Sequence, residues 1–304
     1  MVAIPRSKAI HAIRLRNQMK IIDPHVHLFD LTKGDYHWLK ADNPPFWSDK
    51  TIINKNFSER ALQLNSNAEL TGFVHIEAGF DNKEPWREVQ WLESVCKKDF
   101  RSVACIDITL NTEKFKYHLN KLLTFRSVVG CRYIIDETAV TLLSDIQVQE
   151  NLALLAKYQL SFDAQFSIGD SESVQAVITI LRTIPELKVI INHAGWPPKD
   201  RDSNDYEHWY KNMEFIAQYP QCAIKCSGWE MADRNYQPNW IIDIIKHCFT
   251  CFGEERVMLA SNFPLCLFYG DYAGLWQLYC EHLDISSQQL KLISYENAYL
   301  WYKF

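Results

Sequence analysis

The sequence of 304 residues contains no apolar run of about 18 residues or more, the length that a membrane-spanning helix requires. It also has no stripe of lysine and arginine: basic and acidic residues are interspersed, and the net charge is −5. A nucleic-acid partner would require a basic surface, so we expect none. The first residues include no continuous apolar segment with a small-residue cleavage site. We therefore expect a cytoplasmic protein without a membrane partner.

The nine cysteines do not form the paired clusters that are typical of zinc ribbons or disulfide frameworks. One CxxC motif, Cys248 and Cys251, has no second pair and lies where apolar residues recur at helical spacing. We interpret the cysteines as small buried side chains of a protein from a reducing compartment.

Eight short apolar runs rich in Val, Ile and Cys alternate with longer amphipathic segments. Apolar strands that alternate with helices are typical of a parallel sheet covered by helices, and eight such units predict a single-domain α/β protein, a (β/α)8 TIM barrel. We expect the barrel to span residues 19–304, after an N-terminal extension of residues 1–18. The predicted strands are 19–23, 72–77, 102–108, 127–135, 160–166, 187–194, 222–228 and 256–262, and the predicted helices are 88–98, 113–124, 148–158, 172–183, 208–219 and 240–252.

Polar side chains occur where the predicted strands end, and in such a barrel these ends form the rim of the active site. His25 and His27 are two residues apart on an extended segment, so their side chains point the same way. With His193, which ends the sixth strand, they could hold one zinc or manganese ion or act in a metal-free site; both remain open. Segment 28–57 is expected to cover the site as a lid or floor and carries Tyr36, Trp38, Phe46 and Trp47.

Several segments together match the pattern of a known family: DPHVHLFDL (23–31), YHWL (36–39), VHIEAGFDNKEPWREVQWL (74–92), VVGCRYI (128–134), INHAGWP (191–197), IKCSGW (224–229), RVMLASNFPL (256–265) and ENAYLWYKF (296–304). On these segments the chain resembles the amidohydrolase superfamily. Within it, the chain is similar to the lactonase-like metal-dependent hydrolases of TIM-barrel fold, which include sugar lactonases and the pyrone-dicarboxylate lactonase.

The resemblance implies that His25, His27 and His193 line the catalytic centre and polarise the scissile carbonyl, with or without a metal. It implies that Arg132 binds a carboxylate or hydroxyl of the substrate, a task that suits its planar fork of donors. The implied reaction is hydrolysis of a small sugar lactone or carboxylated lactone. Two alternatives remain: a decarboxylase of the same superfamily, and a degenerate barrel that binds a metabolite without turnover.

The chain departs from the family pattern at the end of the eighth strand. The resemblance implies an acidic residue there, which acts as the base that activates water, but this sequence has Asn262. A carboxamide can neither accept that proton nor neutralise a cation. The base role then falls to a nearby carboxyl (Glu77, Asp23 or Asp163) or to a histidine of a metal-free site. The third possibility is a barrel that binds its ligand without turnover.

Four further residues each allow a functional and a structural interpretation. Glu77 could take part in catalysis or form a salt bridge with Arg132 or Lys225. Lys225 could bind an anionic substrate group or compensate nearby carboxylates. His75 could contact the substrate or be satisfied inside the barrel, and Trp196 could form a wall of the pocket or stabilise its loop. The expected partner is a small-molecule substrate, and the oligomeric state stays open.

Overall fold

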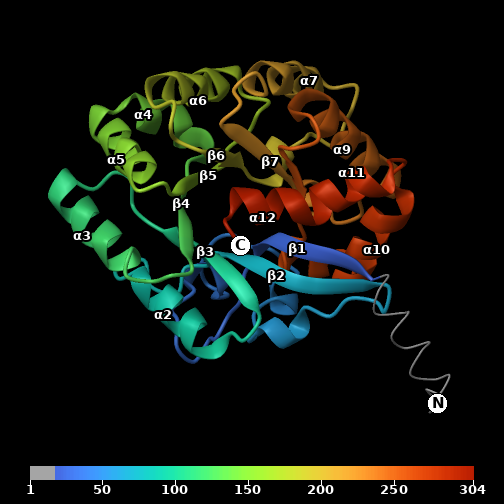
Figure 1. The fold of residues 1–304 in the computed structure, drawn as a ribbon, viewed down its shortest axis with the longest axis horizontal. Coiled ribbons are helices and arrows are strands. Elements are labelled where there is room, and N and C mark those ends of the chain that lie inside the picture. The colour runs from blue at the N-terminus through green and yellow to red at the C-terminus, as the bar shows by residue number, and fades with distance from the viewer. Residues whose placement is uncertain (1–17) are drawn as a thin grey trace, which may run out of the picture.

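Eight parallel strands form the centre of the protein, each hydrogen-bonded to the next in sequence order (Figure 1). The computed structural model describes residues 18–304, so all but the last residue of the predicted N-terminal extension lie outside the described residues. A parallel bridge between Val26 and Phe263 joins the end of the first strand to the segment after the eighth, which closes the ring. The strands are β1 (Met19–Val26), β2 (Ala68–Ile76), β3 (Asp99–Cys105), β4 (Val128–Ile134), β5 (Ser161–Gln165), β6 (Val189–Ile191), β7 (Cys222–Cys226) and β8 (Val257–Leu259). The predicted (β/α)8 barrel is confirmed.

Helices surround this ring of strands (Figure 1). All six predicted helices are present, and several begin where a side chain caps the first turn; Asp170, for example, accepts hydrogen bonds from the backbone N–H groups of Glu172 and Ser173. None of the helices in residues 18–304 is long and apolar enough to cross a membrane. The α-helices are α2 (Trp86–Val95), α3 (Thr112–Leu122), α4 (Ala139–Ser144), α5 (Ile146–Lys157), α6 (Ser171–Thr183), α7 (Asn204–Ile216), α8 (Trp229–Ala232), α9 (Pro238–Phe252), α10 (Tyr272–His282), α11 (Ser287–Lys291) and α12 (Asn297–Trp301).

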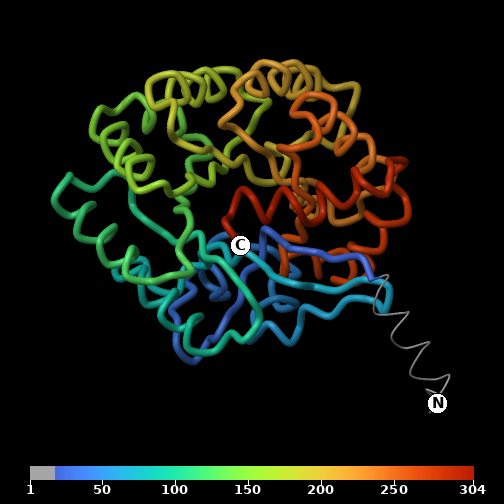
Figure 2. Tube along the Cα trace, in the orientation of Figure 1, coloured from blue at the N-terminus to red at the C-terminus, as the bar shows by residue number. Residues whose placement is uncertain are grey.

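The C-terminal segment closes one end of the barrel. In Figure 2 the red C-terminal trace crosses the centre of the ring beside the blue β1. Ala298 and Tyr302 are fully buried there and belong to the same apolar cluster as inward-facing strand residues. The strand residues of this cluster are Ile22, Val74, Ile76, Val103, Val129, Ile190, Ala223 and Met258. Lys303 donates to the carbonyl of Gln159, just before β5, and the Trp301 indole donates to that of Glu255, just before β8. The C-terminal segment therefore covers the amino-terminal end of the barrel, and the carboxyl-terminal end is the one left open.

The long segment after β1 folds back on the rim of the barrel. Phe29 and Phe57 form an antiparallel bridge with backbone N···O distances of 3.0 and 2.9 Å, which closes the base of this segment. The Trp38 indole N–H donates to the carbonyl of Ala78 (2.8 Å), after β2. The segment is therefore tied to the rim at both its base and its middle. Its 3-10 helices are η1 (His37–Leu39), η2 (Lys50–Ile52) and η3 (Glu59–Ala61).

Candidate active site

A cavity of about 660 Å³ opens at the carboxyl ends of the strands. This is the end at which barrels of this class carry their active sites. Aromatic side chains form much of its wall, and Trp38 and Trp47 of the predicted covering segment are among them. Of the predicted site residues, the cavity is lined by His27, Glu77, Arg132, His193, Trp196 and Asn262, while His25, His75 and Lys225 lie outside its lining.

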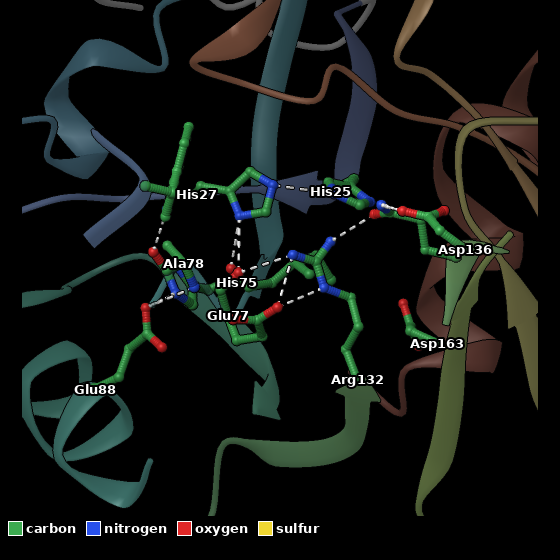
Figure 3. Close-up of polar contacts among 12 residues, drawn as sticks. His25, His27, His75, Glu77, Ala78, Glu88, Arg132, Asp136 and Asp163 are labelled. Carbon is green, nitrogen blue, oxygen red and sulfur yellow. Dashed lines mark hydrogen bonds and ion pairs between the residues drawn. The ribbon is translucent and has the colours of Figure 1, made fainter. Parts of the chain in front are cut away.

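His27 lines the floor of this cavity and faces His25, which is fully buried behind it (Figure 3). The Nε2 atoms of His25 and His27 are 3.2 Å apart. Nδ1 of His27 lies 2.8 Å from the carbonyl of Ile76 and 3.2 Å from that of Glu77. Since a carbonyl only accepts, His27 carries its proton on Nδ1 and has a lone pair on Nε2, to which Nε2–H of His25 donates in the absence of a metal.

His193 joins this pair from the sixth strand. Its ring centroid is 4.5 Å from that of His25 and 4.6 Å from that of Trp196. His193, Ala194, Gly195 and Trp196 have φ values of 56°, 50°, 65° and 56°. Such a left-handed run is costly for residues other than glycine, and it turns the chain sharply so that both rings reach the cavity.

The seventh strand supports His193 through two neighbouring residues. The hydroxyl of Ser227 lies 3.0 Å from Nδ1 of His193. Gly228 has φ +75°, and a Cβ added there would lie 2.6 Å from that same Nδ1. Only glycine fits between this turn and the imidazole without displacing it.

We expect Gly228→Ala to lower the free energy of unfolding by about 2–4 kcal/mol in urea denaturation, because the contact with the imidazole adds to the cost of a left-handed alanine. Gly228 has φ 75° and ψ 20°, a left-handed conformation that costs an alanine about 1 kcal/mol by itself. A loss of about 1 kcal/mol or less would show that the imidazole moves aside without cost.

Burial holds all three histidines neutral. Desolvation, followed by the positive charges of Lys225 and Arg132, lowers the pKa of His25 and of His193 well below the ordinary value. For His27, desolvation and then Arg132 have the same effect on the pKa. At neutral pH these rings therefore offer nitrogen lone pairs, which can bind a metal or accept a proton.

Arg132 is engaged by a carboxylate. Its Nε and Nη2 atoms each lie 2.7 Å from Oε1 of Glu77, and both residues are more than nine-tenths buried (Figure 3). The predicted salt bridge of Glu77 is therefore present, although both side chains also line the cavity. The network continues through Gln165, which donates to Asp136 (3.1 Å), and Asp136 also accepts from the Trp196 indole (3.2 Å).

Lys225 and His75 have the structural environments that the sequence left open as alternatives. Lys225 is fully buried, and its Nζ lies 2.6 Å from Oδ2 of Asp163, which also accepts from Tyr302 (2.8 Å). Nε2 of His75 lies 3.1 Å from Oε1 of Glu88. Since neither side chain lines the cavity, we assign neither a contact with substrate.

Asn262 has a partner that the sequence reasoning missed. Its Nδ2 donates to Oε1 of Glu230 at 2.6 Å, and both residues are 1% exposed. Glu230 follows the seventh strand by four residues, in α8, directly after the matched segment that ends at Trp229. The one feature of the sequence that could have indicated a role for Glu230 is its position just after the seventh strand, at the end of the barrel that carries active sites.

The other two carboxylates considered as replacement bases lie below the cavity. Oδ1 of Asp23 accepts from the backbone N–H groups of His25 (3.2 Å) and Ser261 (3.1 Å). Asp163 is bound by Lys225 and Tyr302. Neither Asp23 nor Asp163 lines the cavity, so neither can contact a substrate there.

Two of the three predicted metal ligands have a suitable spacing. Two nitrogens bound to one tetrahedral zinc are about 3.3 Å apart, close to the 3.2 Å between Nε2 of His25 and Nε2 of His27. The carbonyl contacts of His27 Nδ1 are of the kind that orient metal-bound imidazoles. Within residues 18–304, however, no group of three or more His, Cys, Asp or Glu side chains is arranged to hold a metal. The three-histidine site stays a prediction.

A family model described as Amidohydrolase matches residues 22–304. The protein belongs to this family. It is 29% identical over 307 residues to the uncharacterized protein y4mH of Sinorhizobium fredii, covering 94% of this chain and 99% of that one. It is 30% identical over 266 residues to the L-fucono-1,5-lactonase of Burkholderia ambifaria, covering 86% of each. The predicted family is confirmed, and the chain is an enzyme of the hydrolase class, as predicted.

The fold matches that of a solved amidohydrolase from Burkholderia multivorans. The structure of that protein with bound HEPES has a TM-score of 0.78 and 18% identity, and covers 93% of this chain and 99% of its own. A second structure of it, with bound zinc, has a TM-score of 0.77 and 17% identity over the same shares. At this level of identity, the likeness supports the barrel architecture alone.

Proposed function

We propose that this amidohydrolase opens a neutral sugar lactone by hydrolysis. The observation that carries the proposal is the cluster of three buried, neutral imidazoles, of which those of His27 and His193 line a 660 Å³ cavity with aromatic walls. Neutral imidazoles supply proton acceptors near an ester carbonyl, and aromatic faces bind the C–H faces of sugars. The similarity to an L-fucono-1,5-lactonase supports the same class of reaction.

His193 is the proposed base. Ser227 contacts its Nδ1 and orients the ring, which leaves Nε2 to take the proton of a water molecule. The oxygen of that water forms a bond to the lactone carbonyl carbon, the ring C–O bond breaks, and the departing ring oxygen takes the proton back from the imidazole. The product is the open hydroxy acid. Asn262 orients the attacking water by hydrogen bonding.

A metal-dependent form of the same site is the alternative, and it is supported by the spacing of two nitrogens only. A zinc or manganese ion would be held by Nε2 of His25 and of His27, with His193 beside them, and would polarise the scissile carbonyl. Elemental analysis of protein purified without chelator or immobilised metal distinguishes the two forms of the site. About one metal per chain indicates a metal-dependent hydrolase, and none indicates that the imidazoles act alone.

The charges of the cavity favour a neutral lactone over a carboxylated one. Glu77 offsets the positive charge of Arg132, and Asp136 adds a further carboxylate to the cavity wall. An anionic substrate would meet no uncompensated cation among the described lining residues. The remaining Arg132 donor and the Gln165 and Asp136 side chains suit substrate hydroxyls. The same reasoning disfavours an aromatic carboxylate, the substrate that a decarboxylase would require.

A panel of lactones tests the proposal. We expect L-fucono-1,5-lactone or another neutral aldonolactone to release acid, followed with a pH indicator, with a kcat/KM at least about 100-fold above that for 2-pyrone-4,6-dicarboxylate. Carbon dioxide release from dihydroxybenzoates is measured in parallel. Turnover of no neutral lactone by folded protein, or faster turnover of the dicarboxylate, would contradict the proposal.

A further inference from the structure

The amide of Asn262 is held in one orientation by a buried carboxylate. Asn262 follows β8 with φ 59°, a left-handed conformation, and lines the cavity. Its Nδ2 lies 2.6 Å from Oε1 of Glu230. Because a carboxylate accepts hydrogen bonds and an amide oxygen cannot donate one, the NH2 group must face Glu230. The Oδ1 atom is therefore directed away from Glu230.

Within residues 18–304 the carboxylate of Glu230 has no cationic partner, unlike those of Glu77 and Asp163. Glu77 is paired with Arg132, and Asp163 is paired with Lys225. The Arg234 guanidinium contacts the backbone carbonyl of Glu230, and Oε2 of Glu230 is buried with no hydrogen-bond partner in residues 18–304. Its only side-chain hydrogen bond in that part of the chain is therefore the one from Asn262.

We propose that Glu230 is a positioning residue that makes Asn262 a stronger hydrogen-bond acceptor for the attacking water. The Nδ2–H bond to a carboxylate draws electron density through the amide toward Oδ1, as linked hydrogen bonds polarise one another. Asn262 and Glu230 together then replace the aspartate that the family pattern implies. The proton of the water still goes to His193. This inference rests on the proposed lactone hydrolysis.

The pair makes activity depend on the ionisation of Glu230. Burial raises the pKa of Glu230 to about 7, and the hydrogen bond from Asn262 partly opposes that rise. The groups around it are Arg234, which favours the ionised form, and Tyr236, Cys266 and Tyr279, whose pKa values its charge raises. Since the carboxylate is the polarising form, kcat should fall as the pH drops below about 7.

Glu230→Gln tests the role in catalysis, with L-fucono-1,5-lactone or the best neutral lactone of the panel as substrate. We expect kcat to fall roughly ten- to a hundredfold with KM changed by less than about threefold, and the acidic limb of the kcat profile near pH 7 to disappear. The matched control is Glu150→Gln, an exposed glutamate on α5, which should leave kcat unchanged. An unchanged kcat and pH profile in folded Glu230→Gln would overturn the inference.

Exchanging the amide of Asn262 and the carboxylate of Glu230 distinguishes a positioning role of Glu230 from a purely structural one. Asn262→Asp alone sets two carboxyls at the 2.6 Å contact, where they share a proton, so the new acid is largely silenced at neutral pH. In Asn262→Asp with Glu230→Gln, the glutamine amide can donate to the new carboxylate. We expect the double variant to exceed Asn262→Asp in kcat by about tenfold or more at pH 7. The opposite order would overturn the inference.

A measurement without substrate keeps this inference separate from the proposed function. In protein labelled with 15N at asparagine side chains, the Asn262 NH2 signal is assigned by its loss in Asn262→Asp. We expect one of its protons to shift downfield and to titrate near pH 7 in the wild type, and not in Glu230→Gln. A signal that is identical in both overturns the inference. A titrating signal in a protein that hydrolyses no lactone counts against the proposed function alone.

Discussion

Replacing Lys225 with methionine lowers the free energy of unfolding by about 3–5 kcal/mol, because the change leaves Asp163 as an uncompensated charge inside the barrel. Both side chains are fully buried, and their charged atoms are 2.6 Å apart. Burial lowers the pKa of Lys225 to about 8 even though Asp163 favours its charged form. Asp163 therefore contributes most of the stabilisation of this buried cation, and Asp23 adds to it.

Chemical denaturation of two further variants tests this explanation. Lys225→Met combined with Asp163→Asn removes both charges and still offers an amide oxygen to the Tyr302 hydroxyl, so it should recover more than half of the lost stability. Lys116→Met, at an exposed position on α3, should change the free energy of unfolding by less than about 0.5 kcal/mol. A double variant as unstable as Lys225→Met would show that the loss comes from packing and not from the unpaired charge.

Replacing His27 with asparagine should reduce kcat for the neutral lactone by about a thousandfold while the protein stays folded. An asparagine NH2 can occupy the place of the imidazole Nδ1–H and keep the contact with the Ile76 carbonyl. It cannot replace Nε2, which faces His25 and the cavity. The variant therefore removes the reactive edge of the ring and keeps its anchor.

The matched variant is His27→Gln, whose longer amide reaches the position of Nε2 but not that of Nδ1. We expect it to lose the anchor, so its melting temperature should drop more than that of His27→Asn. Steady-state assays and thermal denaturation of both variants are compared with the wild type. A His27→Asn enzyme with kcat within about tenfold of the wild type would remove His27 from the proposed catalytic floor.

The barrel could be predicted because each of its eight units carries its own local signal. An apolar run followed by an amphipathic helix recurs along the chain, so an error in one unit does not change the fold class. Strand ends were harder to predict. The sixth predicted strand ran from 187 to 194, but β6 ends at Ile191, because His193, Ala194 and Trp196 adopt left-handed conformations. Such conformations cannot be predicted from the sequence at residues other than glycine, which rarely adopt them.

The position of the site followed from the strand ends, but its pairings did not. The sequence brought His25, His27 and His193 to one rim, and their rings do meet there. The sequence could not show whether the Lys225 ammonium lies in the cavity or inside the barrel, because its long side chain could have reached either place. Glu230 was missed because it stands on a short helix beyond the strand, so its contact with Asn262 depends on the path of a loop.

The hydrogen bond of the Tyr302 hydroxyl also limits how far the barrel can fold while the chain is being synthesised. Tyr302 donates to Asp163 from a position 139 residues further along the chain. The end of β1 is bridged to the segment after β8 through Phe263, so the ring closes only once Phe263 is present. On a ribosome, Asp163 therefore emerges long before Lys225 and longer still before Tyr302. The interior of the barrel cannot be completed stepwise during synthesis. Its completion has to wait until Tyr302 has left the exit tunnel.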